Sequence, residues 1–292
     1  MSAKLDIYTA KRRGRITNFL FTSVCFLATI TCVIVLFVLM WNIILQGKSW
    51  LSWDFVDSFP SRFPHKAGIK SALYGSIWLI GLTALFSVTL GVGAAVYLEE
   101  YAPKSRWRKL IQLNISNLAG VPSIVYGILG LALFVRALAL ERSVLSGALT
   151  LTLVVLPIII LASQEALRSV PDSIRRSAYA LGATRWQTVW YQVLPASLPG
   201  IMTGVILALS RALGEAAPLI VVGAMAYVPF VPESLSDEFT SLPIQIFNWT
   251  SRPQEDFHHL AAAGILVLLV VLVSMNAIAI FVRHKYGKKI RW

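Results

Sequence analysis

The chain has 292 residues, of which 57% are hydrophobic and only 14% are charged, with a formal net charge of +12 and a mean hydropathy of +0.70. Soluble domains carry about 25% charged residues, so this composition excludes an ordinary soluble protein and favours an integral membrane protein. The two cysteines, Cys25 and Cys32, lie on one face of one apolar run, which favours two small core residues over a disulfide framework or a CxxC site.

The apolar residues fall into six runs, each long enough to cross a bilayer, which takes about 20 residues of helix. In chain order these runs lie near 17–45, 70–98, 114–137, 143–166, 198–227 and 259–282. The sequence therefore predicts an all-α polytopic membrane protein with six transmembrane helices. A cytoplasmic segment 1–16 precedes the transmembrane domain 17–292, whose core is 70–283. The first run is too long for the apolar part of a signal peptide and predicts a retained anchor.

Most of the 26 lysines and arginines lie on one side of this layout. They occupy the N-terminal segment, the loops 99–113 and 167–197, and the C-terminal tail. Because cytoplasmic loops are enriched in Lys and Arg, this asymmetry predicts that both termini lie in the cytoplasm. The positive charge is thus a topology signal, and no groove-reading motif supports nucleic-acid binding.

The third apolar run opens with NLAGVPSIVYG, in which Gly120, Pro122 and Gly127 are expected to bend or break the helix. Irregular backbone at membrane depth is tolerated only where protein buries it or where it lines a water-filled cavity. The run therefore points to a transport pathway, although proline and glycine are common in membrane helices in general.

The cytoplasmic loop 167–197 is too polar to span the membrane and predicts two short helices. In the first, Ile174, Ala178 and Leu181 recur at helical spacing and form one apolar face. Asp172 precedes this face as the candidate N-cap.

The second half of this loop carries its own helix signals. Gly182 is placed to cap the C-terminus of the first helix, and the sequence TRWQ at 184–187 fits a capping box. Trp186 and Trp190 lie on the apolar stripe that follows, where tryptophan suits a membrane surface. We expect Pro195 to end this helix, so that the loop forms a compact helix–turn–helix knob.

The fifth run contains ALSRALGEAAPL, which places Arg211 and Glu215 inside an apolar segment. A charge in the bilayer is costly without a partner or water, so such residues mark function by default. Four residues apart, the two share a helix face and can pair. Pro218 cannot donate to the carbonyl of Gly214, which predicts a bend at the charges.

Two interpretations of this charged segment are open. In the first, Arg211, Gly214, Glu215 and Pro218 form a substrate pathway or gate, with Arg211 donating to an oxyanion in transit and Glu215 orienting or releasing it. In the second, the pair is structural, either within the chain or across to a second subunit. An unpaired Glu215 would also repel anions, which favours a different ligand.

The loop 228–258 is the longest external segment and the most acidic. Its centre, LPIQIFNW at 242–249, is apolar but too short to span, and predicts a re-entrant or interfacial piece. The four histidines fall at membrane edges without metal-ligand spacing. No nucleophile–base arrangement, cofactor fingerprint or P-loop is present, so the sequence predicts no enzymatic activity, no cofactor and no ATP site in this chain.

The spacing within the cytoplasmic loop resembles the EAA loop of ABC-transporter permeases. Ala178, Gly182, Leu194 and Pro195 hold the pattern of that loop, whereas Arg176, Ser177 and Gln192 stand where the family usually has Glu, Ala and Ile. The resemblance implies that the knob is a coupling helix that inserts into a groove on an ATPase. The residues expected to form this coupling loop are Arg175, Arg176, Ala178, Leu181, Gly182, Ala183, Leu194 and Pro195.

Downstream stretches resemble the PstA family, the permease subunits of bacterial high-affinity phosphate importers. They are 201–219, SLPIQIFNW at 241–249, and the last helix from Ser251. The likeness covers about 70–292 and implies a type I ABC importer permease fold. It also implies partners: a PstC-like second permease, two ATPase subunits on the cytoplasmic side, and an external phosphate-binding protein at the bacterial inner membrane.

The sequence leaves rival functions open. A permease of the same architecture could carry another oxyanion, such as sulfate or molybdate. A membrane scaffold or a phosphate-sensing signalling subunit would bind an ATPase without transporting anything. A passive channel would have no need of the knob.

Overall fold

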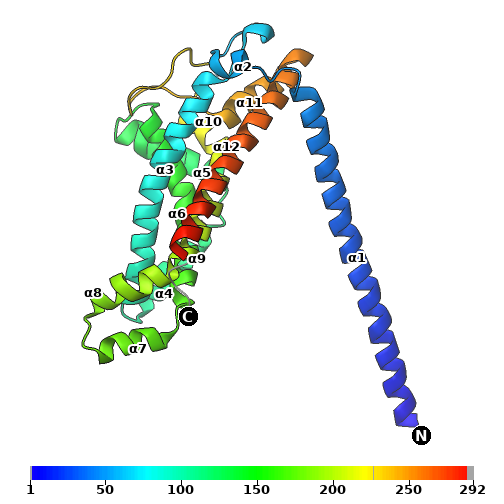
Figure 1. Ribbon diagram of the computed structural model, residues 1–292, viewed down its shortest axis with the longest axis vertical. Coiled ribbons are helices and arrows are strands. Elements are labelled where there is room, and N and C mark those ends of the chain that lie inside the picture. The colour runs from blue at the N-terminus through cyan, green and yellow to red at the C-terminus, as the bar shows by residue number, and fades with distance from the viewer. Residues whose placement is uncertain (1, 226, 288–292) are drawn as a thin grey trace.

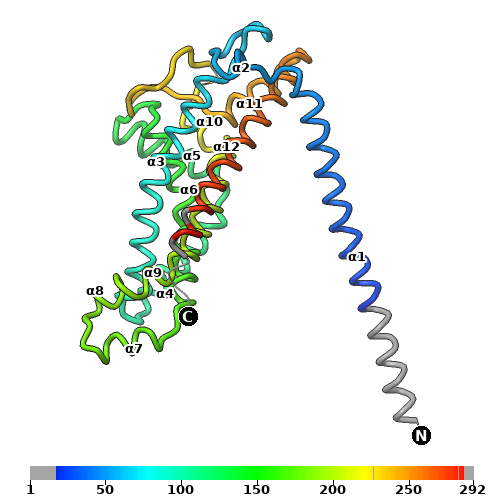
Figure 2. Tube along the Cα trace, in the orientation of Figure 1, coloured from blue at the N-terminus to red at the C-terminus, as the bar shows by residue number. Residues whose placement is uncertain are grey.

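In the computed structural model, residues 2–225 and 227–287 are described, and within them the chain is helical with no β-strand. Figure 2 follows the chain from one helix to the next. The basic tail residues Lys288, Lys289 and Arg291 lie outside the described residues. The elements are α1 (Ser2–Gly47), α2 (Trp53–Asp57), η1 (Pro64–Lys66), α3 (Lys70–Val96), η2 (Tyr97–Tyr101), α4 (Arg106–Leu118), α5 (Ser123–Gly130), η3 (Leu131–Ala137), α6 (Val144–Arg168), α7 (Asp172–Ala180), α8 (Arg185–Thr188), η4 (Val189–Val193), α9 (Leu194–Leu213), α10 (Ala217–Val222), α11 (Leu242–Thr250) and α12 (Glu255–Gly287).

Five helical stretches are long and apolar enough to cross a membrane, and a sixth candidate is a bent pair. The straight ones are Asn18–Gly47, Lys70–Tyr101, Val144–Arg168, Arg185–Leu213 and Glu255–Lys285. The third predicted span is the bent pair: Arg106–Leu118 and Ser123–Ala137 meet at 103°. The expected break at Gly120 and Pro122 is therefore confirmed, and the span begins earlier than predicted.

Helices α3, α6 and α9 pack side by side, with α12 against α9 (Figure 1). Small residues allow this close approach, as they commonly do between membrane helices. A side chain at Gly91 of α3 would collide with Ile159 of α6, and one at Gly204 of α9 would collide with Ala162 of α6. At these two points the helices approach closely because the glycines leave room for the side chains of α6.

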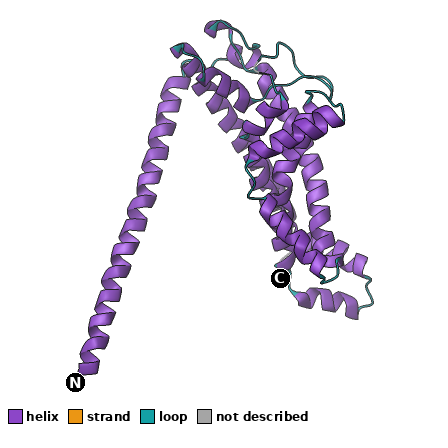
Figure 3. Ribbon diagram, turned by 180° about the vertical axis from the view of Figure 1, so that it is seen from behind, coloured by secondary structure: helices purple, strands orange, loops and turns teal. Residues whose placement is uncertain are grey.

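Helix α1 stands apart from this bundle (Figures 1 and 3). It meets α12 near its C-terminal end, where Gly47 lies against the backbone of Ala262 and Ala263. Its large apolar side chains from Phe19 to Leu45 are exposed on this chain. Such a surface requires lipid or another protein around it.

The end of the bundle that carries α2 and α11 is closed by a buried cluster. Phe55 of α2, Ile69, Trp249 of α11 and Phe257 of α12 are all buried within it. The predicted short apolar piece is thus a real helix, Leu242–Thr250, packed onto α12 and α3. Its first amide, on Leu242, donates to the hydroxyl of Ser76 at 2.8 Å.

The helices α7 and α8 lie at the opposite end of the bundle, near the end of α12 that carries the C-terminus (Figure 1). The predicted knob and the loops predicted to be external therefore lie at opposite ends of the molecule.

Candidate functional site

The charged segment lies at a break between two helices. Helix α9 ends at Leu213, Gly214 is its C-cap, and the chain resumes as α10 at Ala217. Pro218 falls in the first turn of α10, where its missing N–H costs nothing because that amide has no helical partner anyway. The predicted bend is present, and it takes the form of a helix end followed by a helix start.

Arg211 and Glu215 form an ion pair across this break. The Nε of Arg211 donates to Oε1 of Glu215 at 3.2 Å. The Arg211 side chain is 50% exposed on this chain and the Glu215 side chain 17%. The pair is therefore made through one nitrogen, and half of the guanidinium side chain remains available for another partner.

Arg211 belongs to an exposed stripe of α9. The exposed positions on this helix recur every three or four residues, at Gly200, Thr203, Leu207, Arg211 and then Gly214. A guanidinium on a face that pointed into lipid would be costly. The stripe must therefore face protein or water when the chain is in its membrane.

Helix α5, which follows the bend, packs against α10, which follows the charged break. Gly127 of α5 approaches Pro218 so closely that an added Cβ would lie 2.8 Å from both the Cα and the carbonyl oxygen of Pro218. The hydroxyl of Tyr126 braces the bend by donating to the carbonyl of Leu118 at 2.8 Å. The helices that follow two irregular segments, from distant parts of the sequence, are thus in direct contact.

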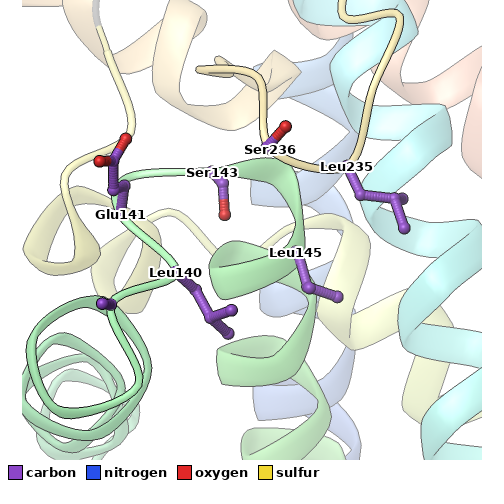
Figure 4. A pocket seen from close by; sticks show the side chains of 7 residues that line it. Leu140, Glu141, Ser143, Leu145, Leu235 and Ser236 are labelled. Atoms are coloured by element: carbon purple, nitrogen blue, oxygen red, sulfur yellow. The ribbon is translucent and has the colours of Figure 1, made fainter.

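The loop-rich end of the molecule, opposite to the knob, carries a pocket lined by two segments of the chain (Figure 4). It has a volume of about 280 Å³ and is lined by Ala139, Leu140, Glu141, Ser143, Leu145, Leu235 and Ser236. The first free amides of α6, on Val144 and Leu145, donate to the carbonyls of Asp237 and Leu235. The long acidic loop is therefore fastened to the start of α6.

The knob formed by α7 and α8 has the caps that the sequence predicts. Gly182 has φ +81, and the amides of Gly182 and Ala183 donate to Tyr179 and Ala178, which closes α7 as a Schellman motif. Thr184 and Gln187 form the expected capping box. Leu181 is 89% exposed at the tip, so the knob presents a rigid turn with an apolar tip.

Two expectations for this loop are wrong. The N-cap of α7 is Pro171, and Asp172 is its first residue, where a carboxylate still favours the positive end of the helix. Pro195 does not end the second helix: α8, η4 and α9 run on as one stretch from Arg185 to Leu213. The π-helical turn η4 satisfies the amide of Leu194 from Val189, so Pro195 follows in the first turn of α9, where a proline is tolerated.

The predicted coupling residues separate into two groups. Arg176, Leu181 and Gly182 are exposed on the knob, and Ala178 and Ala183 are half-buried beside them. Leu194 and Pro195 lie at the start of α9, half-buried against the bundle. Trp186 and Trp190 stack at 5.4 Å and are exposed, while Val189 and Val193 of the same stripe are buried.

Arg175 points away from the exposed surface of the knob. Its Nη2 lies 2.7 Å from Oε1 of Glu100, and the Arg175 and Glu100 side chains are only 16% and 7% exposed. The neighbouring Glu99 pairs with Arg108 at 2.9 Å and Arg168 at 2.6 Å. The sequence interpretation missed both glutamates; their signal was two adjacent acids at the end of an apolar run facing a basic loop.

Among the described residues, no group of three His, Cys, Asp or Glu side chains is placed to hold a metal ion. The charged groups at the break are the guanidinium of Arg211, whose remaining donors can bind an oxyanion, and the carboxylate of Glu215, which already accepts one of its hydrogen bonds.

Comparisons with known proteins identify the family of the chain. Residues 87–288 match the family model described as "Binding-protein-dependent transport system inner membrane component". The chain is 31% identical over 277 residues to the phosphate transport system permease protein PstA 1 of Mycobacterium tuberculosis, covering 93% of this chain and 90% of that protein. It is 32% identical to the phosphate transport system permease protein PstA of Haemophilus influenzae, covering 89% and 92%.

Solved structures of ABC transporters share the fold. A chain of a bacterial alginate ABC transporter superposes with a TM-score of 0.65 at 17% identity, covering 89% of this chain and 92% of that one. A chain of the inward-facing MetNI methionine ABC transporter gives 0.62 at 15% identity, covering 74% and 94%. The architecture is that of a type I ABC importer permease, as predicted.

Proposed function

The chain belongs to the family of binding-protein-dependent transport system inner membrane components, and on that premise we propose that it is a permease subunit of an ATP-driven importer of inorganic phosphate. The observation that carries this proposal is the likeness to phosphate permeases along nearly the whole chain, on both sides of the charged break. The protein is a multi-pass membrane protein of the inner membrane, and it forms half of the translocation pathway.

The role of Arg211 in this proposal is to bind phosphate weakly in transit. A guanidinium offers a planar fork of donors to an oxyanion, and the single hydrogen bond to Glu215 leaves part of that fork free. Glu215 competes with the anion for Arg211, which favours release, since a pathway has to release what it binds. Gly214 and Pro218 provide the helix break that brings these groups to the pathway.

The knob at 172–193 is the proposed contact with a separate ATPase. A Schellman motif ends α7 and a capping box begins α8, so the turn between them is well defined. Because α8 runs on into α9, a movement of the ATPase can be transmitted to the spans as a rigid-body displacement. We propose the exposed residues Arg176, Leu181 and Gly182 as the contacts. In this proposal ATP is hydrolysed by the separate ATPase.

The remaining partners complete the proposal. A second, PstC-like permease would cover the exposed stripe of α9 and the apolar surface of α1. Two ATPase subunits would bind at the end of the complex that carries the knob, and a phosphate-binding protein would dock at the loop-rich end. Both termini would lie in the cytoplasm. The distribution of basic residues supports this orientation.

The proposal is tested by ATP-dependent uptake of labelled phosphate into vesicles that hold the full complex. We expect phosphate uptake in the wild type, competition by excess sulfate or molybdate to be weak, and uptake to be lost in Arg211→Gln while the complex still assembles and hydrolyses ATP. Strong competition by sulfate or molybdate would assign a different oxyanion. Normal uptake in Arg211→Gln would make the charge pair structural, and ATPase binding without any flux would make the chain a scaffold.

A further inference from the structure

Arg175 of α7 makes several hydrogen bonds to the helix bundle. Its Nη1 donates to the carbonyl of Val170 at 2.7 Å, and its Nη2 donates to the carbonyl of Leu167 at 2.9 Å. Its Nε and Nη2 both lie within hydrogen-bond distance of Glu100. One guanidinium thus joins α7 to the end of α6 and to η2 at the end of α3.

These contacts suit the ends of the helices that they join. The last carbonyls of a helix have no helical partner and carry partial negative charge, which a cation stabilises. Leu167 supplies one of those carbonyls on α6, so Arg175 caps α6 from outside. The guanidinium has five donors in a planar fork and here serves four groups, because Nη1 also lies 3.4 Å from Oδ1 of Asp172. The three donors of a lysine ammonium cannot serve all four.

Helix α7 has little other attachment to this part of the bundle. Its backbone packs on α8 and η4, with few contacts to α3, η2 or α6. Ile174 provides an apolar contact with the cluster that contains Leu98 and Leu167. Beside it lies a largely polar cavity of about 350 Å³, lined by Glu99, Glu100, Lys104, Arg108, Arg168, Asp172, Arg175, Tyr179 and Arg185. The Arg175–Glu100 pair bridges α7 and the bundle at this cavity.

The adjacent glutamate extends the link to α4. Glu99 accepts from Arg108 in the first turn of α4 and from Arg168 at the end of α6. Helix α4 is the first half of the bent span, and the second half, α5, packs against α10 directly after the charged break. The two glutamates of η2 therefore stand between the knob and the helix that leads to the proposed pathway.

We propose that Arg175 and Glu100 form a transmission strut, which converts displacement of α7 into displacement of α3, α6 and, through Glu99, α4. Arg175 is in this view a positioning residue for transport, in contrast to the exposed Arg176, which contacts the ATPase directly. The inference rests on the proposed function, since it names the side chains through which ATP hydrolysis would be coupled to phosphate movement.

The test is the ratio of phosphate imported to ATP hydrolysed, measured with the full complex in vesicles. The variants are Arg175→Lys, which keeps the charge but not the fork, and Glu100→Gln, which keeps the size but not the charge. Coupling free energies between sites commonly correspond to factors of 5–150, so we expect each variant to assemble, to hydrolyse ATP and to show a ratio about tenfold below the wild type. The double variant should lower the ratio no further than either single one, because both changes remove the same link.

Arg106→Gln is the matched control. Arg106 is an exposed arginine at the start of α4, close to the same end of the bundle but outside the contacts of Arg175 and Glu100, so its removal should leave the ratio unchanged. Unchanged ratios in Arg175→Lys and Glu100→Gln would overturn the strut, as would failure of both to assemble, which would make the pair purely structural. A wild-type complex that hydrolyses ATP but imports no phosphate would count against the proposed function itself.

Discussion

The Arg211–Glu215 pair at the helix break and the Arg175–Glu100 pair at the knob differ in how many acceptors the arginine serves. At the helix break, Arg211 makes one contact of 3.2 Å through Nε, and half of its side chain is exposed. At the knob, Arg175 serves Glu100 and two backbone carbonyls and is almost buried. Arg211 therefore retains N–H donors for a ligand, whereas the donors of Arg175 are already hydrogen-bonded within the protein.

The difference shows that residue type alone does not identify a transport site. The sequence selected both arginines, Arg211 as a charge inside an apolar run and Arg175 through the resemblance to a coupling loop, and both have a carboxylate nearby. What separates them is the number of protein acceptors around each guanidinium. A saturated arginine can position helices but has no donors left for an anion, while a partly satisfied one can exchange its carboxylate for a phosphate oxygen.

The largest expected effect comes from removing the saturated arginine. Arg175→Leu leaves Glu100 buried without a partner, which should destabilise the protein by about 3–5 kcal/mol. Arg211→Leu removes a half-exposed pair and should cost less than about 1 kcal/mol. Chemical denaturation of the purified complex in detergent measures both. Equal losses for the two variants would contradict the comparison.

The next largest effect tests the close contact between Gly127 of α5 and Pro218 of α10, directly after the charged break. Gly127→Val puts a side chain against the backbone of Pro218 and should destabilise by about 1–3 kcal/mol, because overpacking forces neighbouring groups apart. Gly81→Val is the control, since a side chain at Gly81 meets no atom within 4 Å. The thermal unfolding midpoint of the complex should fall for the first variant and not for the second. A fall of the same size in both would show that the close approach of α5 and α10 is unimportant.

A smaller effect sharpens the role of the partly satisfied arginine. Arg211→Lys keeps the positive charge and loses the bidentate fork, so we expect transport to continue with a KM for phosphate raised by about tenfold, equivalent to about 1.4 kcal/mol. Uptake measured over a range of external phosphate concentrations separates KM from the maximal rate. An unchanged KM would remove the guanidinium geometry from phosphate binding.

The smallest effect concerns a carboxylate outside the membrane. The pKa of Asp237 is lowered below its ordinary value of 3.8, chiefly by the hydrogen bond from the Ser234 hydroxyl and also by the amides of Ser234 and Glu233. Because the folded pKa is depressed, the stabilisation is fully present above the ordinary value and is lost as the pH falls through the folded value.

Asp237→Asn should therefore loosen the 233–237 turn at neutral pH, seen as faster hydrogen exchange of the Glu233 and Ser234 amides. Acidification of the wild type should have the same effect only below pH 3.8. Uptake should be little changed, because the hydrogen bonds of the Asp237 carboxylate stay within the 233–237 turn. Exchange rates equal to those of the wild type at neutral pH would show that Asp237 does not hold the turn.

Several parts of the candidate site were predictable because their signals are local. The caps of α7 and α8 depend on Gly182, Thr184 and Gln187, whose preferences act within one helical turn. The break at Gly214 and Pro218 follows from the same kind of local rule. Pro195 shows the limit of such rules. The π-helical turn η4 precedes it, and Pro195 lies in the first turn of α9 instead of ending the helix before it.

By itself, the sequence determined the membrane class, the positions of the apolar runs, the helix ends with strong caps, and the existence of a charged break in the fifth run. These follow from hydrophobicity and from backbone preferences within a few residues. Only the tertiary structure decided that Arg175 faces inward onto Glu100, that Gly127 meets Pro218, and that Arg211 stays half-exposed. Those facts depend on which distant segments supply hydrogen-bond acceptors and packing surfaces, and no local pattern around an arginine records what lies 75 residues away in the chain.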